Sequence, residues 1–555
     1  MLRITELKLP LNHNEDNLTQ AILDTLDIKP TELMSFNVFK RGYDARKKNA
    51  ILLIYQLDVE VSDITQKRVL KIFKDSNKVK KTPDTSYHFV GHADANFPSV
   101  RQQRPIVIGF GPCGILAALL LAQMGLKPIV LERGQDVRRR TKDTWGFWRK
   151  EKLNTESNVQ FGEGGAGTFS DGKLYSQVKD KRFLSLKVLT EFIKAGAPEE
   201  IMYVSKPHIG TFKLVTMVEK IRADIIQLGG EIRFGKKVDS FLFDEDDNDS
   251  NKNKKIVGVH LASGETLHSR HVVLAVGHSA RDTFSILKEQ GIYMEAKPFS
   301  IGFRIEHPQS VIDKARFGDN AGHPILGAAD YKLVHHCKNG RSVYSFCMCP
   351  GGTVVAATSE EKRVVTNGMS QYSRNERNAN SAIVVGIEPE KDYPEDVLAG
   401  IDLQRKLETL AYELGGENYH APAQLVGDFL NKTPSTKLGD VEPSYKPGIR
   451  LGDLSLALPD FAVDALREAI PIFDRKIKGF AMKDAILTGI ETRTSSPICI
   501  RRDSTYQNMN TKGLYPAGEG AGYAGGILSA AIDGIKVAEA LAKDLLNIQK
   551  TEEIQ

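Results

Sequence analysis

The chain has 555 residues, 41% of them hydrophobic and 26% charged, with a formal net charge of +5. This length allows several domains with large buried cores, and the small net charge does not favour a nucleic-acid partner. The five cysteines lack disulfide-framework spacing, the amino terminus lacks a secretory signal, and no apolar run reaches about 18 residues, so we expect a cytoplasmic protein without a membrane span.

Residues 1–100 predict a small α+β module. The stretches 2–9 and 49–61 are typical of strands, and residues 17–26 carry apolar side chains at helical spacing. Basic residues near 40 and 46 indicate a solvated hairpin or, as the less favoured alternative, a surface for an acidic partner or nucleic acid. The prolines between 78 and 105 then predict a linker.

Residues 105–133 predict a dinucleotide-binding unit. An apolar strand at 106–108 leads through three glycines into a helix of small residues, and a second strand ends at an acid. Such glycines allow a tight turn, close approach of a pyrophosphate and close helix packing, while the helix N-terminus attracts phosphate and the acid binds a ribose hydroxyl. The predicted cofactor contacts are Gly109, Gly111, Pro112, Gly114, Glu132 and Arg133.

A second glycine-rich stretch, at 158–174, predicts a loop that holds a cofactor. Each glycine destabilises a regular element by roughly 0.5–1 kcal/mol relative to alanine, so a plain surface loop would not need so many. A loop whose backbone lies against a flat ring or a pyrophosphate would need this many glycines. The predicted contacts are Gly164, Gly165, Gly167 and Thr168.

The nucleotide fold is predicted to continue to about residue 285. Helices are expected at 184–195 and 211–228, and strands at 230–238, 256–261 and 271–276. Because doubly wound folds bind nucleotides at the ends of their strands, Val238 and Gly277 are further predicted contacts. The charged segment 244–255 is predicted to be a hairpin tip without a function.

Between 286 and 485 this pattern is lost, and strand-like runs such as 342–348 and 353–357 mix with helices such as 402–414. We expect an inserted α+β domain that supplies the substrate side of the cleft. From about 513 the first fold returns as a short strand, a group of glycines and a small-residue helix, which is typical of the flavin end of FAD sites. The predicted contacts are Gly518, Glu519, Gly526 and Ile527.

The predicted fold class is therefore α/β, with a Rossmann-like FAD-binding domain that an α+β substrate domain interrupts and a small α+β domain precedes. The predicted boundaries are 1–100, 101–285, 286–485 and 486–555. No second glycine triplet follows a strand, so one dinucleotide, FAD, is expected to bind firmly. NAD(P)H would then dock transiently as an electron donor, or another protein would supply the electrons.

Together these motifs resemble the glutathione-reductase-like flavoproteins with two dinucleotide folds, and most closely the group of uncharacterised FAD-dependent dehydrogenases, or NAD(P)/FAD-dependent oxidoreductases. The resemblance implies FAD, an interrupted FAD domain and no settled substrate. One departure is Glu519, where many relatives in the wider superfamily carry aspartate. The stretches that carry the resemblance are 44–46, 157–174, 206–211, 347–352, 367–370, 378–381, 491–497 and 513–527.

Two cysteines are candidates for chemistry. Cys347 and Cys349 would point to the same face of an extended strand, which suits packed thiols or, as the less favoured alternative, thiol chemistry at the flavin. A metal site is not predicted, because His335 and His336 do not complete a zinc spacing.

Three further side chains could act near the ring. His208, in a polar turn, is a candidate proton donor or a structural hydrogen-bonding group. Arg493 could bind an anionic substrate or the flavin O2, or form a buried salt bridge with Glu491, and Lys297 is a weaker candidate for the same role. The predicted catalytic residues are thus His208, Cys347 and Arg493.

The predicted function is an FAD-dependent oxidoreductase that acts on an unidentified small molecule. One alternative is a flavoprotein of RNA modification whose basic amino-terminal module binds tRNA, and another is a non-catalytic FAD-bound scaffold or sensor. The nearly balanced charge does not favour the RNA-modification alternative. The oligomeric state is not predicted.

Overall fold

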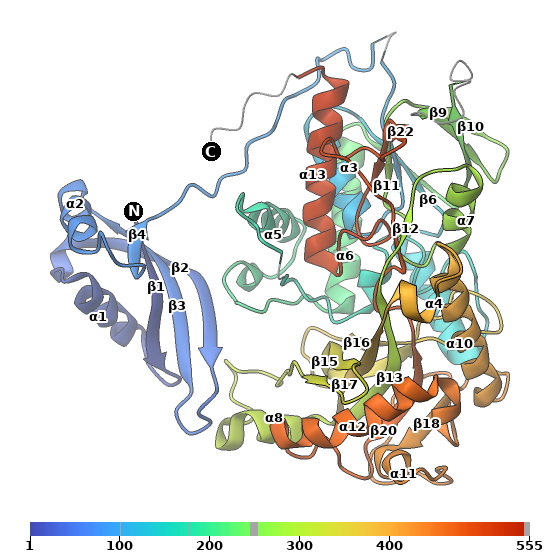
Figure 1. The fold of residues 1–555 in the computed structure, drawn as a ribbon. Helices are drawn as coiled ribbons and strands as arrows, with labels where there is room; N and C mark the ends of the chain where they lie inside the picture. Colours follow the sequence, from blue (N-terminus) through green and yellow to red (C-terminus); the bar gives the residue numbers. More distant parts are fainter. Residues whose placement is uncertain (100–101, 177, 245–253, 549–555) are drawn as a thin grey trace.

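The computed structural model describes residues 1–99, 102–176, 178–244 and 254–548, and its architecture is mixed α/β (Figure 1). The first four strands form an antiparallel sheet in the order β2-β3-β1-β4. Alternate side chains of β3, such as Leu53 and Leu57, are buried beneath the helices that cover one face. These elements are β1 (Leu2–Pro10), α1 (Glu15–Leu26), β2 (Leu33–Asp44), β3 (Leu52–Val61), α2 (Asp63–Ile72) and β4 (Val79–Lys81).

The edge strand β2 attaches this sheet to the rest of the chain. The Arg41 amide donates to the Tyr203 carbonyl at 2.6 Å, and the Ser205 amide donates to the Arg41 carbonyl at 2.8 Å. These backbone bonds satisfy part of an otherwise open sheet edge. They also fix the neighbouring residue, Lys40, near the central part of the molecule.

A parallel sheet in the order β23-β11-β5-β6-β7 forms the nucleotide fold. Its strands are short and mostly apolar, as expected where helices cover both faces of a parallel sheet. The strand β23 joins it some 400 residues after β5, as the sequence predicted. The strands are β5 (Ile106–Ile108), β6 (Ile129–Glu132), β7 (Glu231–Phe234), β11 (Val272–Leu274) and β23 (Leu514–Pro516).

Two helices of this fold, α3 (Pro112–Gln123) and α13 (Ile527–Leu545), pack side by side (Figure 1). Their small residues allow the close approach, since a Cβ at Gly534 would lie 2.2 Å from the Cys113 carbonyl oxygen. Other helices around this fold are α4 (Val137–Lys150), α5 (Leu184–Lys194), α6 (Thr211–Gln227) and α7 (Arg281–Glu289).

The predicted strand 230–238 is corrected to two elements. The strand β7 ends at Phe234, because Gly235 turns the chain with φ +66°, and Val238 begins the next strand. The predicted hairpin tip at 244–255 lies almost entirely outside the described residues. The small sheet here contains β8 (Val238–Phe243), β9 (Lys254–Leu261), β10 (Thr266–His268) and β22 (Thr511–Lys512).

An eight-stranded sheet contains most of the segment predicted as inserted. Its order is β14-β15-β17-β13-β20-β18-β19, with β16 beside β15, and α12 (Asp460–Lys476) packs against it. The strands are β13 (Phe299–Pro308), β14 (Val334–His336), β15 (Ser342–Ala356), β16 (Thr366–Ser370), β17 (Asn378–Ile387), β18 (Ala421–Leu425), β19 (Ile449–Leu451) and β20 (Ile486–Glu491).

One prediction is corrected in this sheet. The strands predicted at 342–348 and 353–357 form one long strand, β15, that bulges interrupt. The predicted boundary at 485 falls directly before β20, which pairs with β13 and β18 in this sheet. No helix among the described residues is both long and apolar enough to cross a membrane.

Candidate cofactor and substrate site

A cavity of about 1270 Å³ extends from the nucleotide fold to the eight-stranded sheet. Its wall includes the β5–α3 turn, the glycine loop 165–173 and the start of α13 on one side, and residues 345–349 of β15 on the other. The volume exceeds the roughly 300–1,000 Å³ typical of a pocket for one small ligand. The cavity therefore has room for a dinucleotide and a second molecule.

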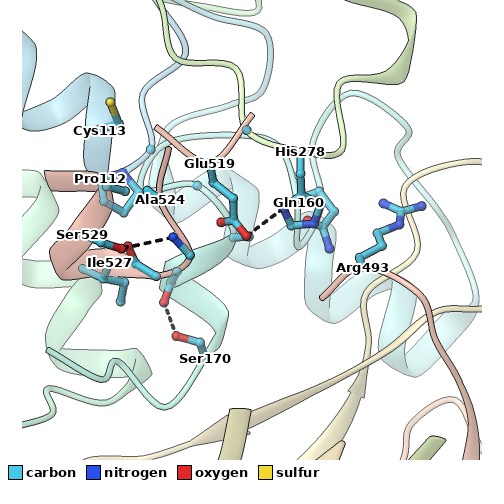
Figure 2. Close-up of a pocket in the computed structure, with 18 of the residues that line it drawn as sticks. Pro112, Cys113, Gln160, Ser170, His278, Arg493, Glu519, Ala524, Ile527 and Ser529 are labelled. Carbon is cyan, nitrogen blue, oxygen red and sulfur yellow. Dashed lines mark hydrogen bonds and ion pairs between the residues drawn. The ribbon is translucent and has the colours of Figure 1, made fainter. Parts of the chain in front are cut away.

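The helices α3 and α13 both begin at this cavity, and Figure 2 shows Pro112 and Ile527 close together on its wall. The residues before them, Gly111 and Gly526, provide no side-chain cap for the first amides. Free N–H groups and the helix dipole attract negative charge at such positions. A Cβ at Gly526 would meet no atom within 4 Å, so the space beside it is open. These residues fit the pyrophosphate and the flavin end of FAD.

Glu132 ties three segments of the nucleotide site together. Its Oε2 accepts the Phe110 amide at 2.8 Å, and its Oε1 accepts the amides of Gly134 at 2.8 Å and Gly162 at 2.9 Å. A carboxylate offers about four acceptor positions, so about one is left for a ribose hydroxyl. The ribose contact stays a prediction.

The glycine loop lies directly against the β5–α3 turn. A Cβ at Gly165 would come within 2.8 Å of the Gly111 Cα, which explains why this position lacks a side chain. Gly165 and Gly167 line the cavity, whereas the predicted contacts Gly164 and Thr168 lie behind its wall. There a Cβ at Gly164 would meet the Thr168 Oγ1 at 2.1 Å.

A buried arginine, Arg140 of α4, holds this loop from behind. Its guanidinium donates to the carbonyls of Asn158 at 2.8 Å and of Val159 and Glu163 at 2.7 Å. Sequence reasoning did not select Arg140, because a helical arginine that faces the core has no local signature. Its role is to shape the loop.

Glu163 in the same loop predicts a pH-dependent stability. Burial raises the pKa of this carboxyl from 4.5 to about 7. A folded-state pKa above the unfolded value means that stability is fully present below pH 4.5 and is lost as pH rises through about 7, by about 3 kcal/mol at most. We expect Glu163→Gln to remove this loss.

Melting temperatures of the wild type and Glu163→Gln across that pH range test the prediction. The matched control is Glu219→Gln. Glu219 pairs with an arginine, is more exposed than Glu163 and has a lowered pKa. Parallel pH profiles for the wild type and Glu163→Gln would contradict it.

At the flavin end, Glu519 lines the cavity and faces His278, with 3.4 Å between Oε1 and Nδ1 (Figure 2). Sequence reasoning did not select His278, although it directly follows the predicted contact Gly277. Its buried Nε2 has no hydrogen-bond partner among the residues that the structure describes. Gly518 does not line the cavity, and its amide instead donates to the Asp533 carboxylate at 2.8 Å.

Arg493 lines the cavity, but its ionic partner is not the predicted Glu491. It donates to both oxygens of Glu408, at 3.2 and 3.1 Å, and to the hydroxyls of Ser279 and Ser359. Glu491 pairs with Arg304 at 3.1 Å. Because Glu408 occupies one edge of the Arg493 guanidinium group, only the part of that group that faces the cavity is left to bind a ligand.

Cys347 and Cys349 both line the cavity, but β15 is irregular between them. Cys347 has φ +42° and is exposed, whereas Cys349 is buried, so the regular extended strand that the prediction assumed is interrupted here. Surrounding protein raises the pKa of the Cys347 thiol to about 12. Since the thiolate is the reactive form, this environment does not favour nucleophilic chemistry at neutral pH.

His208 lies away from the cavity wall. Its Nε2 is 2.9 Å from the Tyr372 carbonyl oxygen, and its ring stacks on the Tyr372 ring. This placement supports the structural alternative for His208 over direct proton donation. Of the other predicted residues, Val238, Gly277 and Arg133 line the cavity, and Arg133 also pairs with Glu156 and Asp282. Lys297 does not line the cavity.

The fold and the cavity thus define a mixed α/β protein that binds a dinucleotide. Residues 298–494 match the family described as "FAD-dependent protein, C-terminal domain-like", and residues 1–60 match a domain of unknown function (DUF8436). The chain is 47% identical over 541 residues to an uncharacterized protein of Clostridium beijerinckii, which covers 97% of this chain and 98% of that protein. The chain therefore belongs to the same family as that protein, and its cofactor is FAD.

Solved structures with a similar chain course include two enzymes. A probable FAD-dependent monooxygenase from Pseudomonas aeruginosa is 12% identical, with a TM-score of 0.34, over 81% of this chain and 88% of that one. A 3-ketosteroid-Δ4-(5α)-dehydrogenase from Rhodococcus jostii RHA1 is 11% identical, with a TM-score of 0.35, over 82% and 99%. Similarity at this level carries no argument about activity.

Proposed function

We propose that this chain is an FAD-dependent oxidoreductase in which a small molecule and the flavin exchange electrons inside the cavity. The observation that carries the proposal is the continuity of the cavity from the glycines of the nucleotide fold to Phe346, Asn367 and Glu491 beside the eight-stranded sheet. A scaffold that only stores FAD would not need this second compartment.

Bound FAD supplies the redox chemistry, and the protein contributes position and charge. The start of α3 would hold the pyrophosphate, and the start of α13 would stabilise negative charge at the flavin O2. The wall that β15 and β16 provide would orient the substrate and exclude water. The Arg304–Glu491 pair, at 3.1 Å, keeps the charge of the buried arginine compensated beside this wall.

The finer organisation belongs to the same proposal. We interpret residues 1–100 as an amino-terminal domain, 101–285 and 492–555 as the FAD-binding domain, and 286–491 as the substrate domain. The pairing of β20 motivates the shifted boundary. Membership of the glutathione-reductase-like group, transient docking of NAD(P)H and a cytoplasmic location also stay predictions.

Anaerobic mixing of the FAD-loaded chain with NADH or NADPH, followed by a panel of acceptors, tests the proposal. We expect the absorbance of oxidised flavin to bleach faster than that of free FAD and to return with an acceptor. A flavin that no donor reduces faster than free FAD, in a chain that binds FAD firmly, would favour the non-catalytic scaffold.

A further inference from the structure

We propose that the substrate carries an anionic group, a carboxylate or a phosphate, that binds the ammonium group of Lys173 at the sheet end of the cavity. This inference rests on the proposed function and deepens it by naming a substrate class. Its evidence is the set of charged side chains that line the cavity and the ion-pair partners of each one.

Most charged side chains at the sheet end of the cavity have a partner within the protein. Asp171 is bound by Arg374, Asp330 by Lys206, and Glu491 by Arg304. Three lysines on the same wall, Lys40, Lys173 and Lys332, differ from these paired side chains. Within the described ranges, no carboxylate lies within ion-pair distance of any of the three. The cavity therefore has an excess of positive charge.

Lys173 is the innermost of these lysines. It follows the glycine loop, and its Nζ donates to the Met348 carbonyl of β15, beside Cys347. An ammonium group has three donors, and this is its single hydrogen bond among the described residues. A neighbouring carboxylate, Asp171, is occupied by Arg374, with bonds of 2.9 and 2.5 Å.

The charge of Lys173 is retained despite this enclosure. Burial works against the charged form, but the neighbouring Cys349 and Asp171 raise the pKa of Lys173 on balance. Asp171 is itself bound by Arg374, so an anion that enters the cavity would supply the direct ion pair that Lys173 lacks among the described residues. The free donors and the missing direct ion pair both point to an anionic ligand.

Lys40 and Lys332 extend the positive charge to the mouth of the cavity. Lys332 precedes β14, and Lys40 comes from β2, which the Arg41 backbone bonds hold in place. Clefts lined by one sign of charge concentrate ligands of the opposite sign and speed their association. This use of Lys40 also gives the amino-terminal basic segment a role that needs no nucleic acid.

The test uses the FAD-loaded full-length chain with benzoate, benzamide and inorganic sulfate as probes, followed by the flavin absorption spectrum. We expect benzoate to bind about tenfold or more tightly than its neutral amide, as a hydrogen bond to a charged group implies. Lys173→Met should remove that preference and Lys173→Arg should retain it, with the FAD content unchanged.

A second measurement tests the role of the two lysines at the mouth of the cavity. The double variant Lys40→Ala/Lys332→Ala should slow benzoate association and weaken its dependence on salt. The matched control Lys71→Ala changes an exposed lysine of α2, outside the cavity, and should change neither.

Equal affinities for benzoate and benzamide, an unchanged preference in Lys173→Met, or no spectral change with either benzoate or sulfate would each overturn the inference. Failure of the proposed function is distinguishable, because it would show as a chain whose bound flavin no donor reduces, whatever the probes do.

Discussion

Gly526→Asp is expected to reduce FAD affinity at least about a hundredfold, or about 3 kcal/mol, while the fold is retained. Gly526 precedes α13 with φ 164° and ψ 172°, an extended conformation that any residue adopts. A Cβ there would meet no protein atom within 4 Å, so the protein itself tolerates the substitution. The new carboxylate would instead occupy the cavity and place negative charge where the helix N-terminus is expected to face the flavin O2.

Two measurements separate cofactor loss from misfolding. Titration of the FAD-free chain with FAD gives the affinity, and the melting temperature of the FAD-free chain reports the fold. Gly146→Asp is the matched control, because a Cβ at Gly146 in α4 also meets nothing within 4 Å and this residue lies outside the cavity wall. Purification of Gly526→Asp with a full complement of FAD would contradict the assignment of the flavin end.

The parts of this site that the sequence predicted depend on contacts between residues close together in the chain. Gly114 is an example, since a Cβ there would lie 1.9 Å from the carbonyl oxygen of Gly109, only five residues earlier. The spacing of strand, turn and helix therefore carries the information for the β5–α3 turn.

The parts that the sequence did not predict depend on distant partners. Arg493 was paired with Glu491 because the two are close in sequence, yet its partner Glu408 lies 85 residues away on α10 (Ala399–Gly415). A glutamate in a helix usually faces solvent, so nothing local marks it as buried. The irregularity of β15 at Cys347 and Cys349 likewise lies in its pairing with β17.

Glu408 lies at the contact between the nucleotide fold and the eight-stranded sheet. Its side chain is fully buried and accepts hydrogen bonds from Arg281 at 2.6 and 2.9 Å, from Arg493, and from the Thr492 hydroxyl at 2.7 Å. Arg281 begins α7, and Arg493 follows β20. One carboxylate thus compensates two buried guanidinium groups from segments far apart in the chain.

Glu408→Gln is expected to destabilise the folded chain by about 3–5 kcal/mol, because it leaves buried positive charge without its partner. Burial alone would raise the pKa of Glu408, but Arg281 and Arg493 hold it well below its usual range. A lowered folded-state pKa gives stability that is present above the unfolded pKa and is lost only in strong acid. The deficit should therefore be constant across neutral pH, unlike the effect at Glu163.

Melting temperatures of the FAD-loaded chain at several neutral pH values check this, with Glu413→Gln as the matched control on the exposed side of α10. A loss no larger than that of Glu413→Gln would show that Glu360, the other carboxylate bound to Arg281, compensates the buried charge by itself. A loss that matches the expectation, together with altered flavin reduction, would mean that this ion cluster also sets the position of the sheet relative to the flavin.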